Sequence, residues 1–221
     1  MAELDRSDAV VVIGLGRFGG AVADSLMRLG HPVLGIDSDE RLVQSFANRL
    51  THVVAADASD TDALRQLGVA DMGRAVVGIG TDLEASVLSV LALTELKVRD
   101  IWAKATSRRH GAILSRMGAQ HVIFPESSMG GRVAHLITSK MIDFIEFEDG
   151  FAIAKVRAPA STVGRSLADA ALRTHYGITV VGTKMRGADF TYAQPETVVA
   201  PDALLIVAGP TDKVERFAAS S

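Results

Sequence analysis

Short apolar runs alternate along the first half of the chain with segments in which apolar residues recur every three or four positions. Runs with the length of buried strands occupy residues 10–13, 33–36, 52–56, 74–79, 101–104 and 121–124. Helical spacing occupies residues 18–29, 39–48, 59–67, 83–96 and 108–117. The first helix would carry an apolar face made of Phe18, Val22, Leu26 and Leu29. Strict alternation of strand and helix predicts an α/β fold with a Rossmann-like, doubly wound parallel sheet covered on both faces.

Two of these helices carry further signals. Ser59 and Asp62 resemble a capping box that would open the helix over 59–67. The apolar spacing over 83–96 predicts an amphipathic helix.

The pattern changes after residue 125. Pro125 and Glu126 suit the first turn of a helix that would run to about Lys140, and Gly130–Gly131 would let it bend. Strands then follow over 142–147, 151–156, 178–183 and 203–208, with helices over 167–173 and 211–219, the last capped by Thr211. The sequence therefore predicts a first domain over 1–126, a linking helix over 127–140 and a small α+β domain over 141–221.

The glycine pattern Gly14-x-Gly16-x-x-Gly19 lies between the first strand and the first helix. In this context Gly14 allows a tight turn, Gly16 lets the backbone approach a phosphate, and Gly19 lets the helix pack closely on the strand. Asp37 closes the next apolar run, where a carboxylate can accept hydrogen bonds from ribose hydroxyls and would repel a 2′-phosphate. We expect a nucleotide at this turn; the alternative is a glycine-rich turn without a ligand.

Further candidates follow the other strands, because ligands of such sheets lie beyond the carboxyl ends of the strands. Arg17 is either a phosphate contact or a solvated loop arginine, and Lys104 is either a phosphate contact or a surface charge. Asp57 could accept from an adenine amino group or cap the next helix. Glu126 would repel phosphates unless a divalent cation lies between them, although the helix dipole alone also explains it. Gly78 to Gly80 complete this edge.

Composition and missing motifs argue against several classes of function. The net charge of −3 gives no basic footprint for nucleic acid and no polybasic membrane anchor. The chain has no cysteine, its six histidines show no metal-binding spacing, and no GxSxG motif occurs. We find no signal peptide and no apolar stretch long enough to span a bilayer, so we expect a cytoplasmic protein. We find no residue pattern typical of the proton relay that a dehydrogenase needs. We therefore expect the nucleotide to be an effector rather than a cosubstrate, and the protein not to be an enzyme.

Five segments carry a resemblance to a known family: 12–19, 36–37, 56–58, 101–105 and 125–130. In order and spacing they resemble the cytoplasmic regulatory subunits of Ktr/Trk-type potassium transporters, in which an RCK (TrkA-N) Rossmann domain precedes a TrkA-C domain. The resemblance extends into the second domain over 167–177 and 202–209. Other readings of the glycine turn are a small NAD-dependent oxidoreductase and an NAD(H)-binding redox sensor.

The resemblance implies a site for ATP or ADP, and sometimes NAD(H), in the glycine-loop pocket. It assigns the ribose acid to Asp37, the adenine contact to Asp57 and a divalent cation, Mg²⁺ or Ca²⁺, to Glu126. The full set of implied nucleotide contacts is Gly14, Gly16, Arg17, Phe18, Gly19, Asp37, Asp57, Ala58, Gly80, Lys104 and Glu126.

The resemblance also implies an assembly and a second ligand. Subunits would form dimers within an octameric ring that docks on a membrane-embedded potassium transporter subunit of the KtrB/TrkH type, at the inner face of the membrane. Some relatives bind cyclic di-AMP, and the matching positions are Val163, Arg173, Tyr176 and Pro195. Gly164 departs from the aliphatic residue often found beside them.

Overall fold

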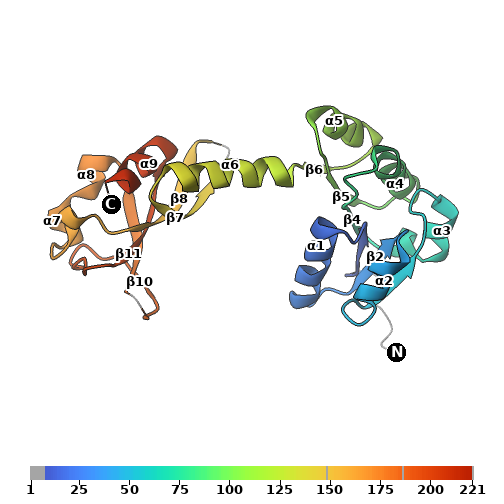
Figure 1. Cartoon of the computed structure of the whole chain (residues 1–221), viewed down its shortest axis with the longest axis horizontal. Helices are drawn as coiled ribbons and strands as arrows, with labels where there is room; N and C mark the ends of the chain where they lie inside the picture. Colours follow the sequence, from blue (N-terminus) through green and yellow to red (C-terminus); the bar gives the residue numbers. More distant parts are fainter. Residues whose placement is uncertain (1–7, 148, 186, 221) are drawn as a thin grey trace. The chain divides into compact units, whose positions relative to one another are not determined.

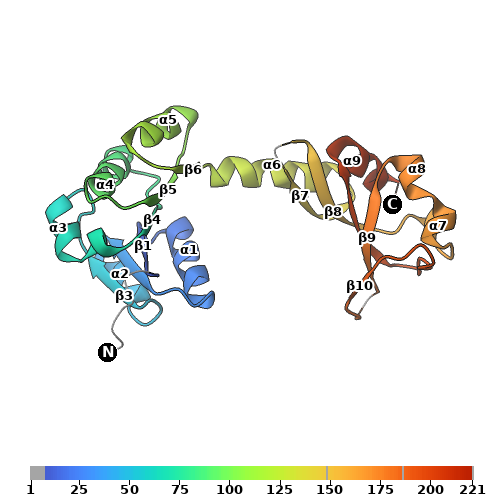
Figure 2. The ribbon, with the colours of Figure 1, turned by 180° about the vertical axis from the view of Figure 1, so that it is seen from behind.

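The computed structural model describes residues 8–147, 149–185 and 187–220. The N-terminal residues considered above for a signal peptide lie mostly outside this range. The chain divides into two compact units, the first ending at Glu126 and the second beginning at Ser127 (Figure 1, Figure 2). Each unit has its own hydrophobic core.

The first unit is a six-stranded parallel sheet in the order β3-β2-β1-β4-β5-β6. Its strands are β1 (Val10–Ile13), β2 (Val33–Asp37), β3 (His52–Ala55), β4 (Arg74–Val77), β5 (Asp100–Lys104) and β6 (His121–Ile123). Its helices are α1 (Arg17–Arg28), α2 (Glu40–Phe46), α3 (Thr61–Gln66), α4 (Leu83–Glu95) and α5 (Arg108–Met117), with a 3₁₀ turn at Val69–Asp71. This order is that of a doubly wound Rossmann-like sheet, as the sequence predicts.

The central strand β1 shows why the first unit folds around its apolar runs. All four of its residues are buried, with Val11 and Ile13 in the core beneath α4 and α5, and Val10 and Val12 in the core beneath α1 and α2. A strand with helices on both faces needs apolar side chains at every position rather than at alternate ones.

The second unit is built on a five-stranded antiparallel sheet in the order β10-β9-β11-β8-β7. Its strands are β7 (Met141–Glu146), β8 (Phe151–Arg157), β9 (Thr179–Lys184), β10 (Phe190–Tyr192) and β11 (Leu204–Pro210). Its helices are α7 (Leu167–Ala170), α8 (Leu172–Tyr176) and α9 (Thr211–Ala219), with a 3₁₀ turn at Ala160–Thr162. Helix α6 (Pro125–Thr138) begins at the end of the first unit and leads into this sheet. The unit is therefore α+β, as the sequence predicts.

Several local predictions were wrong. Asp60, not Ser59, caps α3, accepting from the amides of Asp62 and Ala63. Thr211 does not cap α9, because its hydroxyl donates to Glu146 at 2.9 Å. The helix expected over 167–173 is two short helices, α7 and α8, separated by Ala171 at φ +48°. Strand β10 was not predicted.

Helix α4 was also predicted wrongly as amphipathic. Val90 and Leu93 are buried, but Leu88 and Leu91 each remain 37% exposed on the opposite side. Small hydroxyl side chains, Ser86 and Ser89, occupy part of the buried face. Apolar side chains therefore lie on both the buried and the exposed side of the helix and do not form a single stripe.

Candidate nucleotide site

In the glycine turn between β1 and α1, two glycines are required by the backbone, whereas the third borders open space. Gly14 has φ +85°, and a Cβ on Gly19 would lie 1.8 Å from the Gly14 carbonyl oxygen, so neither position accepts another residue without rearrangement. A Cβ on Gly16 would meet nothing within 4 Å. Gly16 is thus the position at which a ligand can approach the backbone.

The N-terminus of α1 is free of protein partners among the described residues. Gly16 is its N-cap and supplies no side-chain hydrogen bond, and the first turn contains no acidic residue. The first amides of a helix carry a partial positive charge and lack intrahelical partners. This end of α1 is therefore suited to bind an anion such as a phosphate.

Asp37, at the end of β2, is held beside this turn. Its carboxylate accepts from the amide of Leu15 at 2.6 Å and from the amide of Asp39 at 2.9 Å. Each carboxylate oxygen can accept a further hydrogen bond, so the group keeps acceptor capacity for a ribose hydroxyl. The bond to Leu15 adds a role that the sequence did not reveal, because it fastens the glycine turn to β2.

Asp57 follows β3 and is exposed. It accepts from the amide and the hydroxyl of Ser59 at 2.9 and 2.7 Å, and these hydrogen bonds hold the pKa of its carboxyl below the ordinary value. Because Asp60 caps α3, the alternative of a capping role for Asp57 is wrong. The neighbouring Ala58 is buried in the core, so only its backbone is placed to meet a ligand.

Lys104 is not the free surface charge that the sequence left open. Its side chain is only 12% exposed, and its Nζ forms an ion pair with Glu126 Oε1 at 2.5 Å. The same Nζ lies 5.7 Å from the centre of the Phe18 ring and 3.2 Å from the position that a Cβ on Gly80 would take. Gly80 therefore leaves room for the lysine head group beside the glycine turn.

Glu126, in the first turn of α6, is 68% exposed. The hydrogen bond from Lys104 lowers the pKa of its carboxyl below the ordinary value, with smaller contributions from its own backbone amide and from the charge of Arg17. Among the described residues no three His, Cys, Asp or Glu side chains are grouped to hold a metal ion. A cation at Glu126 would therefore take its other ligands from a bound phosphate or from water.

The residues proposed for a second ligand all belong to the second unit. Val163 follows the 3₁₀ turn, Arg173 and Tyr176 are on α8, and Pro195 is in the loop after β10. The Tyr176 ring packs edge-on against Phe217 at 5.1 Å between ring centres. Gly164 has φ +78°, which explains in physical terms why a β-branched residue is not found there.

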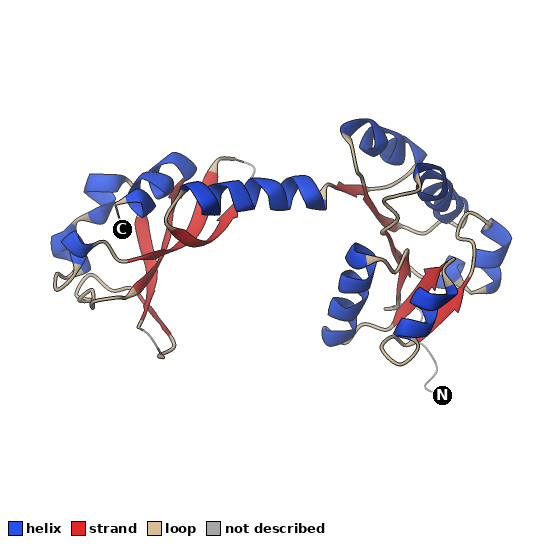
Figure 3. Ribbon diagram, in the orientation of Figure 1, coloured by secondary structure: helices blue, strands red, loops and turns tan. Residues whose placement is uncertain are grey.

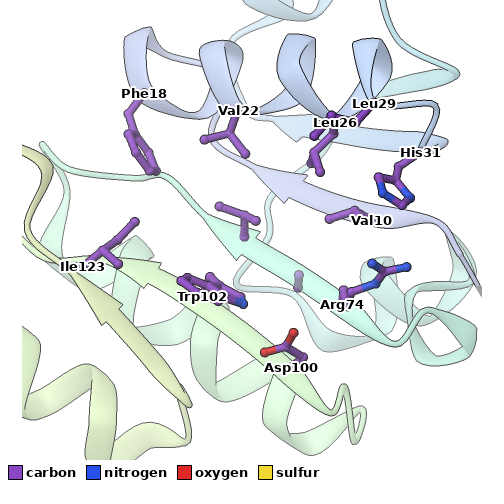
Figure 4. A pocket seen from close by; sticks show the side chains of 12 residues that line it. Val10, Phe18, Val22, Leu26, Leu29, His31, Arg74, Asp100, Trp102 and Ile123 are labelled. Atoms are coloured by element: carbon purple, nitrogen blue, oxygen red, sulfur yellow. The ribbon is translucent and has the colours of Figure 1, made fainter. Parts of the chain in front are cut away.

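The apolar face of α1 is only partly covered: Leu26 packs against the core around β1 and β2, whereas Leu29 is 74% exposed. The buried residues of α1 are Gly19, Gly20 and Ala23, whose small size brings the helix close to the strands. The predicted apolar face instead borders an open groove of about 270 Å³ (Figure 4). The lining residues are Val10, Phe18, Val22, Leu26, Leu29, His31, Arg74, Ala75, Val76, Asp100, Trp102 and Ile123.

The floor of this groove is the face of β4, β5 and β6 on the side of α1 (Figure 4). Trp102, stacked on His121 at 4.0 Å between ring centres, is 38% exposed there. Arg74 and Asp100 gather at one end, whereas Phe18 and Ile123 form the apolar end (Figure 4). Amphipathic spacing could not reveal the groove, because the pattern shows that a face is apolar but not what covers it.

Two family models match the chain. The model of the TrkA-N domain matches residues 10–125, and that of the TrkA-C domain matches residues 151–220. In the part of the chain that the structure describes, no helix has the length and apolar character needed to cross a membrane.

Two relatives are similar over nearly their whole length. The chain is 33% identical over 213 residues to the Ktr system potassium uptake protein A of Bacillus subtilis (strain 168), with 96% of each protein covered. It is 35% identical over 208 residues to the Ktr system potassium uptake protein C of the same organism, with 93% of this chain and 94% of that protein covered.

Solved structures share the fold. The RCK domain of GsuK has a TM-score of 0.67 at 19% identity, covering 99% of this chain and 49% of its own. The GsuK channel bound to NAD has a TM-score of 0.66 at 19% identity (98% of this chain and 40% of that chain covered). GsuK bound to ADP has a TM-score of 0.51 at 18% identity (60% and 35% covered). With both domains matched and relatives above 30% identity, the chain belongs to the TrkA-N/TrkA-C family of Ktr and Trk potassium uptake proteins.

Proposed function

We propose that the chain is a regulatory subunit that binds ATP or ADP and gates a membrane-embedded potassium transporter of the KtrB/TrkH type. The observation that carries this proposal is the uncapped N-terminus of α1, with open space at Gly16 and two cations, Arg17 and Lys104, beside it. Such an arrangement suits the phosphates of a nucleotide. The names of the potassium uptake relatives supply the transported ion.

Asp37 and Asp57 extend the proposed site toward the nucleoside. Asp37 keeps acceptor capacity for the ribose hydroxyls and repels a 2′-phosphate, and Asp57 is a fixed acceptor for an adenine amino group. Both features fit an adenine nucleotide with an unmodified ribose.

ATP and ADP differ by one phosphoryl group, so only contacts to that group can favour one conformation over another. In the proposed site Arg17 and Lys104 donate to phosphate oxygens, while Glu126 holds Mg²⁺ or Ca²⁺ together with them. A phosphate at Lys104 competes with Glu126 for the same Nζ. Because Glu126 is in the first turn of α6, the nucleotide would act on the helix that leads to the second unit.

Two apolar surfaces support assembly of the chain into an oligomer, which we propose to be an octameric ring. The groove between α1 and β4 to β6 is open, and α6 has no buried residue and exposes a stripe of Met129, Val133 and Ile137. These residues are four positions apart and lie on one helical face. We propose that α6 of a second copy covers the groove, and that Leu88 and Leu91 of α4 contact a further copy. The assembled ring would lie at the inner face of the membrane.

NAD(H) is the second candidate ligand. GsuK has been observed with NAD and with ADP, and the acceptors of Asp37 suit the ribose of either nucleotide. An NADH-responsive sensor or a small oxidoreductase would use the same glycine turn. Cyclic di-AMP at Val163, Arg173, Tyr176 and Pro195 remains a separate proposal for the second unit.

Calorimetric titration of the purified chain tests these assignments. ATP, ADP, NADH and cyclic di-AMP are each titrated with and without Mg²⁺ or Ca²⁺. The proposal expects ATP and ADP to bind tightly, with the cation strengthening ATP binding alone. Glu126→Gln should remove that cation effect. Tight NADH binding with no response to ATP would instead favour the redox sensor or the oxidoreductase.

A further inference from the structure

Among the described residues of the second unit, side chains cover only one face of its five-stranded sheet. Along its strands alternate residues are buried, such as Phe144, Ala154 and Leu205, each at most 3% exposed. They pack against α9 and its neighbours, which Figure 3 shows on one side of this sheet. Because side chains of a strand alternate between the two faces, the residues between these point to the opposite face.

One half of this opposite face is apolar. The pairing of β7, β8 and β11 places Ile145 beside Ile153 and Ala208, and Phe147 donates its amide to the carbonyl of Phe151 in the same hairpin. Ile145, Phe147 and Phe151 are between 40% and 54% exposed. Three large apolar side chains that remain exposed side by side indicate a contact surface.

The other half is cationic and aromatic. The same pairing places Arg157 beside Leu204 on β11, Leu204 beside Lys184 on β9, and Lys184 beside Phe190 on β10. Lys155 and Lys184 direct their Nζ atoms over the same Phe190 ring, at 5.8 and 5.3 Å from its centre.

The cations of this half differ in whether a carboxylate lies beside them. Lys184 forms no ion pair within the described residues, and Arg157 lies 3.9 Å from Asp202. Lys155 lies opposite Asp143 on β7. The hydrogen bond from Arg132 lowers the pKa of that carboxyl most, and the charge of Lys155 lowers it further. Within the described part of the chain Lys184 therefore lacks a carboxylate partner, and Lys155 shares Asp143 with Arg132.

We infer that this open face docks a segment of a partner protein that carries apolar side chains at one end and carboxylates at the other. The apolar end packs on Ile145, Ile153 and Phe151, and the carboxylates pair with Lys155 and Lys184. Charge complementarity sets the direction of the segment along the strands. The inference rests on the proposed function, which supplies a membrane transporter subunit as the partner.

The separation of the two halves argues against other occupants. Two copies packed face to face about a twofold axis would bring cations against cations, or cations against the apolar half. A lipid surface suits apolar side chains with cations around them, whereas here the cations lie together in one half of the face and Ile145, Phe147 and Phe151 lie in the other. A segment with two chemically different ends matches both halves at once.

The test measures the affinity of the full chain for the detergent-solubilised transporter subunit encoded with it. We expect Lys155→Glu/Lys184→Glu to weaken binding roughly tenfold or more, and Phe151→Ser to weaken it independently. The matched control is Arg216→Glu on α9, an exposed charge reversal on the covered side of the same unit, which should bind as the wild type does. Circular dichroism melting of every variant separates a folding defect from a lost contact.

Several outcomes would overturn the inference. Equal affinity of the wild type and the double variant would do so while leaving nucleotide regulation intact, because calorimetry with ATP tests that separately. Binding of the chain alone to phosphatidylglycerol vesicles, lost in the double variant, would assign the face to lipid. A lower oligomer mass of the double variant in light scattering would assign it to a second copy. Failure of the wild type to bind the subunit would overturn both this inference and the proposed partner.

Discussion

The two sheets of the molecule differ in where they leave side chains uncovered. In the first unit the central strand β1 is buried on both faces, and the unpartnered backbone amides gather at one edge, around Gly16 and Arg17. In the second unit a whole sheet face is open, from Phe151 at one end of β8 to Arg157 at the other.

This difference separates two kinds of recognition. Groups that converge on one edge of a parallel sheet suit a small anionic ligand, because backbone amides and cations can meet it from several sides. An extended face with apolar and charged halves suits a macromolecule, because its affinity comes from many spread contacts. The comparison predicts that changes in one unit affect one kind of binding and spare the other.

The largest effect is expected from Gly19→Ala in the first unit. The added Cβ would lie 1.8 Å from a carbonyl oxygen, so we expect a loss of at least about 3 kcal/mol of stability together with nucleotide binding. Gly16→Ala is the matched control, since its Cβ meets nothing within 4 Å. It should keep the wild-type melting temperature and lose only ATP affinity. Equal melting temperatures for the two variants would contradict the division of roles between the glycines.

Leu205→Ala probes the second unit in the same way. Leu205 is fully buried between β8 and β9, and its truncation should lower the free energy of unfolding by about 3 kcal/mol. We expect the ATP affinity of the folded variant to be unchanged, because the residue is remote in sequence from the glycine turn and belongs to the other core. Denaturant titration and calorimetry measure the two quantities. A weakened ATP affinity would show that the units are coupled through their cores.

Arg17→Ala should leave stability unchanged and cost roughly 2 kcal/mol of ATP binding, about thirtyfold in Kd, because a charge-assisted hydrogen bond to phosphate is lost. Arg28→Ala, at the other end of α1, serves as the control. Calorimetry with ATP gives both values. Unchanged affinity in the Arg17 variant would remove this residue from the site.

The smallest effect concerns pH. His110 is 3% exposed, its Nε2 has no hydrogen-bond partner among the described residues, and burial lowers the pKa of its ring below 6.5. The unfolded chain therefore takes up a proton at this position before the folded chain does. Stability should fall as pH drops below 6.5, by at most about 1.4 kcal/mol per pH unit from this group.

His110→Asn keeps an acceptor for the Thr106 amide and removes the titration. Urea titrations at several pH values should show a flatter dependence for this variant below pH 6.5 than for the wild type. Parallel curves would show that the His110 ring is protonated inside the folded chain.

Sequence reasoning predicted the elements whose ends carry local signals. Helix α5 begins and ends where expected, because Ser107 accepts from the amide of His110 and Gly118 at φ +113° stops the helix. The glycine turn and Asp37 were identified for the same reason, since their roles follow from strand, turn and helix in succession. The doubly wound parallel sheet followed from the alternation of apolar runs with segments of helical spacing.

Features that depend on contacts between distant residues could not be predicted from the sequence. The groove beneath α1 depends on which strands lie beside the helix, and Phe18 to Leu29 show the same spacing whether they are covered or open. The Lys104–Glu126 pair joins residues 22 positions apart through neighbouring strand ends. Strand β10 has only three residues, all of them exposed, so no buried apolar run marks its pairing with β9.

Potassium flux is the measurement closest to the central claim. The transporter subunit is reconstituted into vesicles with the wild-type chain or with Arg17→Ala, and uptake is followed with saturating ATP or ADP. We expect uptake by the wild-type complex to differ between ATP and ADP, and this difference to disappear in the Arg17 variant. Equal uptake with ATP and ADP in the wild-type complex would contradict this expectation.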